Sequence, residues 1–239
     1  MLSLSPEELR KLNLTIDTLE ALTNLPLAQQ NMTDVVAWSV DQANAILMNY
    51  FENVPPPNLT AVDLTALGQF ICCMTVEQIA QISAAEYRSV IAKMGQVTCL
   101  QQETLVALKN KSEEAIGSLS SWTTSILLQI GNVAAGMNSL ELSSMSEDLL
   151  KLLPPGAVSL FPENVLKELS PKLLSLLNPE SLASMTTAQR DALNPEQLTA
   201  VKTALGELPP PPEGFSQLSL SNTITQISSS HWQESHLLM

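Results

Sequence analysis

The second half of the chain repeats a short pattern of polar and apolar residues every eight positions. Each repeat opens with a cap residue or a proline, and leucines follow within a few positions, as in residues 170–174. The openings are Ser146, Pro154, Pro162, Ser170, Asn178, Thr186 and Asn194. Ser, Thr and Asn accept hydrogen bonds from the free N–H groups of a helix start, and proline fits its first turn. Each repeat therefore predicts the start of a short helix.

Helices of this length are predicted to be stable only when they are stacked. A single short helix is marginal in water, because fixing its first turn yields few hydrogen bonds. Repeats that bury their leucines against neighbouring repeats form a solenoid. No stretch alternates apolar and polar residues for long enough to predict a strand. We therefore expect an all-α fold, a superhelical array of short helices.

The first half of the chain is less regular, but it also predicts helices. We expect two short helices within residues 1–30 and one longer helix over residues 33–52, which carries a single apolar stripe. Capping boxes predict further helix starts at Thr60, Thr75 and Ser83. The whole region should thus continue the helical array of the second half.

The array should end near residue 206. Residues 100–137 predict longer helices, broken near Asn110 and Gly131 among other positions. A run of prolines and then a polar segment rich in Ser, Thr and Gln follow, without Lys or Arg. We therefore divide the chain into a helical repeat domain, residues 1–206, and a tail, residues 207–239, that is expected to be disordered.

Charge and hydropathy limit the classes of partner. The chain of 239 residues is 45% hydrophobic, which is enough for a large core. Its formal net charge of -13 repels phosphate, so nucleic acid and anionic lipid are poor partners. The longest uncharged stretch, residues 115–140, holds too many Ser, Thr, Asn and Gln residues for a membrane span. We expect protein partners and no transmembrane helix in this chain.

The sequence gives little support for catalysis. The chain has two histidines, His231 and His236, and both lie in the tail, five positions apart rather than the four of a helical zinc site. The scattered glycines form no phosphate-binding loop, and paired carboxylates such as Glu7 and Glu8 fit the first turns of helices. We expect no enzyme, no metal site and no cofactor.

Two kinds of residue bear on the cellular compartment. Sequons for N-glycosylation occur at Asn13, Asn31, Asn58 and Asn110. The three cysteines are Cys72, Cys73 and Cys99. They fit equally well as reduced core residues or as a bridge from Cys72 or Cys73 to Cys99 in an oxidising compartment.

The cysteine region resembles the mesothelin, stereocilin and otoancorin family. The stretch from Leu67 to Ile79 runs a cysteine into a capped short helix, and the stretch from Gln96 to Leu105 is similar to that family's second cysteine site. The resemblance covers about residues 1–206. It implies a helical superhelix related to armadillo folds, in extracellular, glycosylated, surface-attached proteins used in adhesion. It also implies a disulfide, for which we expect Cys73 to pair with Cys99 and Cys72 to be the alternate.

The resemblance also makes a functional prediction. We expect a non-enzymatic adhesion protein, extracellular or at the cell surface, that joins cells to cells or matrix by binding proteins through its helical repeats. The alternative is an intracellular helical-repeat scaffold with reduced cysteines. The chain shows no secretory signal or lipid-anchor signal of its own. We therefore expect it to be a C-terminal or partial chain of a longer precursor.

Overall fold

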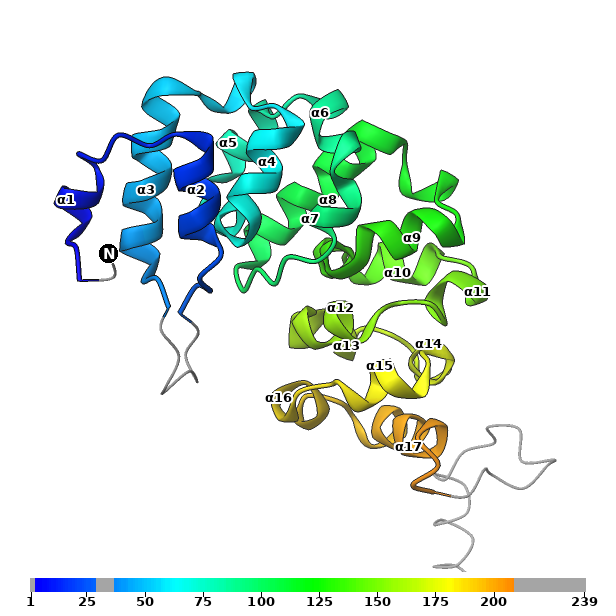
Figure 1. Ribbon diagram of the computed structural model, residues 1–239. Helices are drawn as coiled ribbons and strands as arrows, with labels where there is room; N and C mark the ends of the chain where they lie inside the picture. The colour runs from blue at the N-terminus through cyan, green and yellow to red at the C-terminus, as the bar shows by residue number, and fades with distance from the viewer. Residues whose placement is uncertain (1–2, 29–36, 209–239) are drawn as a thin grey trace, which may run out of the picture.

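The computed structural model describes residues 3–28 and 37–208, and this part of the chain is all-helical (Figure 1). It holds 17 α-helices and four 3-10 helices, and its one β-type pairing is an isolated bridge between Leu27 and Trp38. The helices follow one another along a bent row, with α1–α8 across the top of Figure 1 and α12–α17 below. Within the described residues, no helix is long and apolar enough to cross a membrane. The prediction of an all-α chain is confirmed.

The first part of the row contains the two longest helices, α3 and α8. Its elements are α1 (Pro6–Leu9), α2 (Ile16–Thr23), α3 (Val40–Asn53), η1 (Pro56–Asn58), α4 (Ala61–Leu67), η2 (Gly68–Cys73), α5 (Val76–Gln81), α6 (Ala84–Ser89), α7 (Ile91–Met94), α8 (Gln102–Ile116), η3 (Leu119–Ser121), α9 (Thr124–Ile130), η4 (Gly131–Gly136) and α10 (Ser139–Ser144). The elements η1–η4 are 3-10 helices.

The second part is the series predicted from the eight-residue repeat. Its helices are α11 (Glu147–Leu150), α12 (Pro155–Leu160), α13 (Glu163–Lys167), α14 (Pro171–Leu176), α15 (Pro179–Ala183), α16 (Thr187–Asp191) and α17 (Pro195–Ala204). Each of the seven predicted openings is the N-cap of one of these helices. The pattern of cap residues therefore predicted the start of every helix in this part correctly.

Three predictions for the first half were wrong in detail. Helix α3 begins at Val40 rather than near residue 33, because Ser39 forms the capping box with Gln42. Ser83 is the N-cap residue of α6, as predicted, but the predicted capping box is absent: the Ser83 side chain makes no capping bond, and the Glu86 carboxylate accepts from the backbone N–H of Ala61. Helix α8 runs through Asn110 without a break. Asparagine lowers helix propensity by too little to end a helix that packing supports.

Helices α11–α17, which we name the ladder, pack so that each helix contacts the one three places further along the chain. Helix α11 contacts α14, α12 contacts α15, α13 contacts α16 and α14 contacts α17. Helix starts of such a pair are 24 positions apart, as for Ser146 and Ser170, so three eight-residue repeats make one layer. Each layer buries leucines such as Leu174 and Leu182 that a lone helix would expose to water.

Polar side chains join the layers of the ladder in a fixed register. Ser181 Oγ, Gln189 Nε2 and Gln197 Nε2 donate hydrogen bonds to the carbonyls of Leu153, Phe161 and Leu169, each 28 positions earlier. Gln189 and Gln197 also accept, through Oε1, from the backbone N–H of their own N-cap residue. Both glutamines therefore cap their own helix and also satisfy a loop carbonyl of the layer before.

Two stretches of the first part share one arrangement of helices. We name them the first unit, residues 39–82, and the second unit, residues 101–145. Each holds a long helix, a 3-10 helix, a seven-residue helix, a 3-10 helix that starts at a glycine, and a short capped helix. Gly68 and Gly131, which start those 3-10 helices, are 63 positions apart and have φ values of 48° and 54°.

Burial and packing agree between the two units. The buried residues of α3 are Ala43, Ala45, Ile46, Leu47, Asn49 and Tyr50, and each corresponds, 62 positions later, to one of the buried residues Leu105, Ala107, Leu108, Lys109, Lys111 and Ser112 of α8. Helices α1 and α2 contact α3 and α4 as α5 and α7 contact α8 and α9. The two units are therefore one structural repeat with different side chains.

Candidate binding surface and its supports

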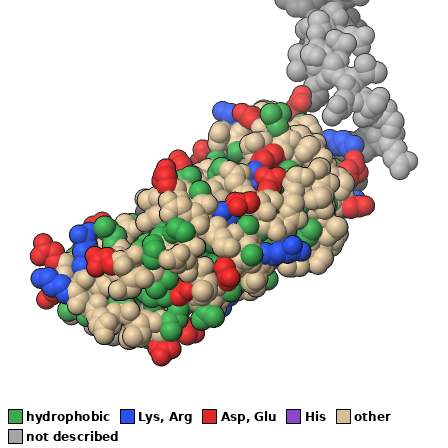
Figure 2. All heavy atoms as spheres, turned by 90° about the horizontal axis from the view of Figure 1, so that it is seen from above, with side chains coloured by type: hydrophobic (Ala, Val, Ile, Leu, Met, Phe, Trp, Pro, Cys, Tyr) green, Lys and Arg blue, Asp and Glu red, His purple; other side chains and the backbone are tan. Residues whose placement is uncertain are grey.

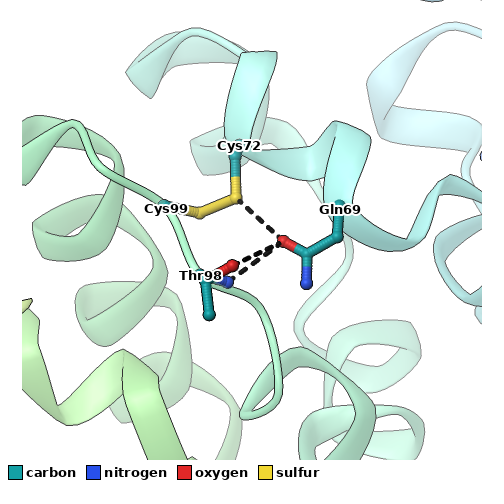
Figure 3. The surroundings of a disulfide bond; sticks show 4 residues. All are labelled: Gln69, Cys72, Thr98 and Cys99. Atoms are coloured by element: carbon teal, nitrogen blue, oxygen red, sulfur yellow. Dashed lines mark hydrogen bonds between the residues drawn. A yellow bond between two sulfur atoms is a disulfide. The ribbon is translucent and has the colours of Figure 1, made fainter. Parts of the chain in front are cut away.

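A disulfide fixes the first unit to the segment that leads into α8 (Figure 3). Cys72, near the end of η2, is bonded to Cys99, with 5.1 Å between the two Cα atoms. Gln69 lies one 3-10 turn before Cys72, and its Oε1 accepts from the backbone N–H of Thr98 at 3.0 Å. This side of η2 therefore faces residues 98–99.

The structure corrects the order in which we placed the two adjacent cysteines. Cys73, the expected partner, is a free thiol, and the alternate Cys72 forms the bond. Cys73 lies about a third of a turn away from Cys72 on η2, off the side that Gln69 turns toward Thr98. Burial raises the pKa of the Cys73 thiol to about 11, so it remains protonated and unreactive at neutral pH.

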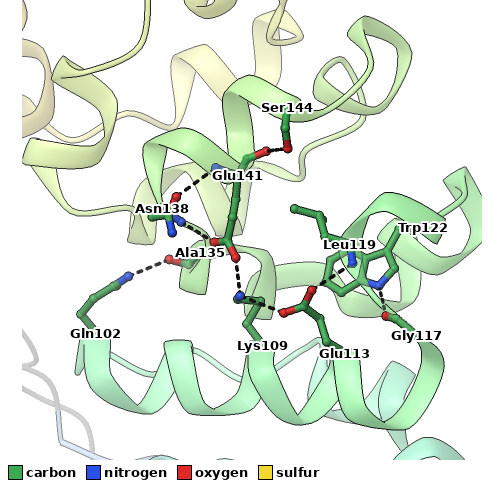
Figure 4. Close-up of polar contacts among 10 residues, drawn as sticks. All are labelled: Gln102, Lys109, Glu113, Gly117, Leu119, Trp122, Ala135, Asn138, Glu141 and Ser144. Carbon is green, nitrogen blue, oxygen red and sulfur yellow. Dashed lines mark hydrogen bonds and ion pairs between the residues drawn. The ribbon is translucent and has the colours of Figure 1, made fainter.

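A buried lysine links two helices of the second unit to each other (Figure 4). Lys109 Nζ lies 2.6 Å from Glu141 Oε1 and 3.0 Å from Glu113 Oε2, and its side chain is almost fully buried. Burial lowers the pKa of Lys109, but hydrogen bonds and the charges of Glu141 and Glu113 more than offset this and hold it above its ordinary value. Lys109 therefore stays charged and links α8 to α10.

The neighbouring Lys111 acts on the other side of α8. Its Nζ donates to the carbonyls of Ala80 and Ile82 at the end of α5, at 2.8 and 2.9 Å, and to Glu114. In the first unit the corresponding Asn49 donates to carbonyls at the end of α1. Both units thus use one polar residue of the long helix to cap an earlier short helix.

A hollow of about 510 Å³ opens beside Lys109. Helix α8 forms one wall with Gln102, Val106 and Asn110, and Asn164 and Val165 of α13 line it as well. Asn110 and Asn164 are exposed, and their side chains make no hydrogen bond to any described residue.

Beside this hollow, the backbones of η4 and α8 are in close contact. A Cβ at Gly136 would lie 2.3 Å from the carbonyl oxygen of Leu105 in α8. Gln102 Nε2 donates to the carbonyl of Ala135 at 3.0 Å, which holds η4 against α8 at this point.

Three of the four sequons lie in the described residues, and Asn31 lies outside them. Asn13, Asn58 and Asn110 are exposed, and within the described part of the chain none of their side chains is hydrogen-bonded. All three asparagine side chains are therefore exposed to solvent and have room for a glycan. The hydroxyl residue of each sequon has a structural role, because Thr15 and Thr60 are N-caps and Ser112 is buried against Tyr87. Residues 113–208 contain no sequon.

The surface shows no patch of one charge on the face drawn in Figure 2. Acidic and basic side chains are interspersed there, and hydrophobic side chains lie in small groups between them. Two of the most exposed large apolar residues are Leu140 at 80% and Val62 at 66%. Leu140 belongs to α10 in the sequon-free part, and Val62 belongs to the first unit.

Other predicted site residues gain no support from geometry. His231 and His236 lie outside the described residues. Glu7 and Glu8 are in the first turn of α1, where Glu8 completes the capping box of Ser5. Across residues 3–28 and 37–208, no three His, Cys, Asp or Glu side chains are grouped so that they could hold a metal ion.

Comparison with known proteins gives relatives but no family model that matches the chain. Human otoancorin is 32% identical over 164 residues, which are 67% of this chain and 13% of otoancorin. Mouse otoancorin is 33% identical over the same length, with 14% of its chain covered. Mouse stereocilin is 28% identical over 137 residues, 55% of this chain and 8% of stereocilin.

The chain is similar to otoancorin and stereocilin. These relatives support the family that the cysteine region resembles, while its mesothelin branch stays a prediction. The chain spans about an eighth of otoancorin, so what the whole of otoancorin does is not carried over to this chain directly.

Proposed function

We propose that this chain is a non-enzymatic module of an extracellular or cell-surface adhesion protein. It would take part in cell–cell or cell–matrix attachment by binding other proteins. The observation that carries the proposal is the similarity to otoancorin over 164 residues, because the family resemblance implies surface-attached adhesion proteins. Three sequons with exposed asparagines and a disulfide fit an oxidising, extracellular compartment.

The proposed binding surface is the exposed edge of a superhelical solenoid built from the short helices. Stacked helices present many similar edges along one surface, which suits a protein partner that spans several repeats. We place the determinants between residues 58 and 206, and chiefly in residues 113–206, which contain no sequon. Glycans at Asn13 and Asn58 lie on the far part of the row, and of the three described sequons only Asn110 borders this region, where α8 and α13 line one hollow.

Surface display tests the proposal directly. The chain would be displayed on non-adherent cells and scored for attachment to epithelial cells and to extracellular matrix. We expect attachment that Leu140→Ser weakens and that the matched change Val62→Ser in the first unit leaves intact. A displayed protein that attaches to nothing would contradict the proposal. If the protein made in the cytosol is soluble and binds intracellular partners, the alternative function, an intracellular helical-repeat scaffold, replaces the adhesion proposal.

A further inference from the structure

We propose that a glycan on Asn110 is seated in the hollow between α8 and α13, where its first sugar contacts Asn164. Glycans on Asn13 and Asn58 would instead extend freely into solvent. The proposal rests on the proposed function, because it requires the chain to enter the secretory pathway. It adds a site and a structural role that the sequon alone does not give.

The position of Asn110 separates it from the other two described sequons. Asn13 lies between α1 and α2, and Asn58 ends η1, so both stand in short connections. Asn110 lies within α8, a helix of 15 residues, and its side chain lines the hollow of about 510 Å³. A rigid helix therefore directs the first sugar toward a fixed wall, which a loop would not do.

The chemistry of the wall suits a sugar. The exposed Asn164 amide has no hydrogen bond to a described residue and can donate to and accept from sugar hydroxyl and acetamide groups. Val106, which is 36% exposed, offers apolar area to the C–H face of the ring. The charges of Lys109 and Glu141 are already paired with each other. A neutral sugar in the hollow would therefore not have to remove water from an unpaired charge on either side chain.

The attachment must precede folding of α8. In the transfer, Nδ2 of Asn110 attacks the anomeric carbon of an oligosaccharide carried on a lipid diphosphate. A carbon–nitrogen bond forms, the bond from that carbon to the diphosphate oxygen breaks, the lipid diphosphate leaves, and the amide loses one proton. Ser112 of the sequon is fully buried and bonded to the Leu108 carbonyl in the folded chain. The unfolded chain entering the secretory pathway is therefore the substrate.

Timed enzymatic removal of glycans tests the seat. The full chain is secreted from a eukaryotic host behind a secretion signal, and glycopeptide mass spectrometry gives occupancy at each asparagine. The native protein is then treated with peptide-N-glycosidase. We expect release from Asn110 to be about tenfold slower than from Asn58, which corresponds to about 1.4 kcal/mol of contact between sugar and protein. After denaturation, the two rates should be equal.

Two variants make the result specific. Asn164→Ala keeps the sequon and should speed release at Asn110 toward the Asn58 rate, while Asn24→Ala, at an exposed asparagine far from the hollow, should leave both rates unchanged. An empty Asn110 beside an occupied Asn58 would overturn the inference, and so would equal native rates. Both results leave the attachment assay untouched. Conversely, a displayed chain that attaches to nothing overturns the proposed function without altering the release rates.

Discussion

The first and second units have one backbone arrangement but are supported by different chemistry. The Cys72–Cys99 disulfide fixes the first unit to the segment before α8, whereas the buried ion pairs of Lys109 join two helices within the second unit. At the residue that corresponds to Cys72, the second unit has Ala135, whose carbonyl accepts from Gln102. The difference teaches that the arrangement of helices does not depend on one kind of bond, so each unit can be weakened by a different treatment.

The two glycines that start η2 and η4 give the sharpest contrast. Gly68 and Gly131 share a positive φ, but a Cβ at Gly68 meets nothing within 4 Å, whereas one at Gly131 would lie 2.3 Å from the Gly95 carbonyl oxygen. Gly95 is also the point where the backbone N–H of Asn132 donates, at 2.7 Å. The close contact between α7 and η4 therefore requires a residue without a Cβ at position 131, whereas no such contact depends on Gly68.

The largest effect is expected from Gly131→Ala, with Gly68→Ala as its matched control. The positive φ costs each variant about 1–3 kcal/mol of unfolding free energy. The clash with Gly95 should add about 1–3 kcal/mol for Gly131→Ala alone. Urea titration followed by helical circular dichroism measures both. Equal losses would mean that the contact between α7 and η4 relaxes without cost.

The next largest effect is expected from Cys99→Ser. Loss of the bridge should lower the unfolding free energy by about 3 kcal/mol in the chain-entropy account. The loss should fall on the first unit, because a stacked array couples mainly to its neighbours. Hydrogen exchange by mass spectrometry should show faster exchange in α3–α5 and little change in α14–α17.

Cys73→Ser serves as the control for that prediction. Its thiol is free, so the variant keeps the bridge and should retain slow exchange in α3–α5. Non-reducing peptide mapping of the secreted wild-type protein should find the peptide of Cys99 joined through Cys72. A bridge through Cys73 would instead restore our first expectation from the sequence.

A smaller effect is expected in the ladder from Gln197→Ala. The side chain donates to the carbonyls of Lys167 and Leu169, and the Leu169 site is buried. Removing the donor should cost about 1–3 kcal/mol, since a buried carbonyl loses its partner. Exchange should quicken in α13, α14 and α17 but not in the first unit. Gln81→Ala, at an exposed residue of α5, should have little effect on either region.

Sequence reasoning succeeded in the ladder for a physical reason. The caps and leucines of each repeat lie within eight positions, so local chemistry placed all seven N-caps. The interlayer bonds were missed because they join residues 28 positions apart. A signal existed, since Ser181, Gln189 and Gln197 follow the same eight-residue spacing at the third helical position.

The repeat of the two units was not predictable in the same way. It rests on burial, and one position can be filled by unlike residues, as with Leu47 in α3 and Lys109 in α8. A lysine can take a core position only because Glu141 and Glu113 come from elsewhere to pair with it. Likewise, Cys72 was ranked behind Cys73 because nothing local reveals that Gln69 turns η2 toward Thr98.

The smallest effect is expected from pH, and it should again separate the two units. Burial raises the pKa of Asp63, but hydrogen bonds from Thr60 and Tyr50 more than offset this and hold the pKa below its ordinary value. A carboxyl with a lowered pKa contributes stability above its unfolded pKa and loses it as pH falls through the folded pKa. The corresponding residue of the second unit, Ile126, has no such dependence.

Lys109 should act in the opposite direction in the second unit. Its raised pKa means that its contribution is present below the pKa of unfolded lysine and is lost as pH rises through the folded value. The urea midpoint of Asp63→Asn should therefore approach that of the wild type in acid, and the midpoint of Lys109→Met should approach it in alkali. If the difference in urea midpoint between either variant and the wild type stays constant across pH, the charge of that side chain contributes nothing to stability. Its shape alone would then support the unit.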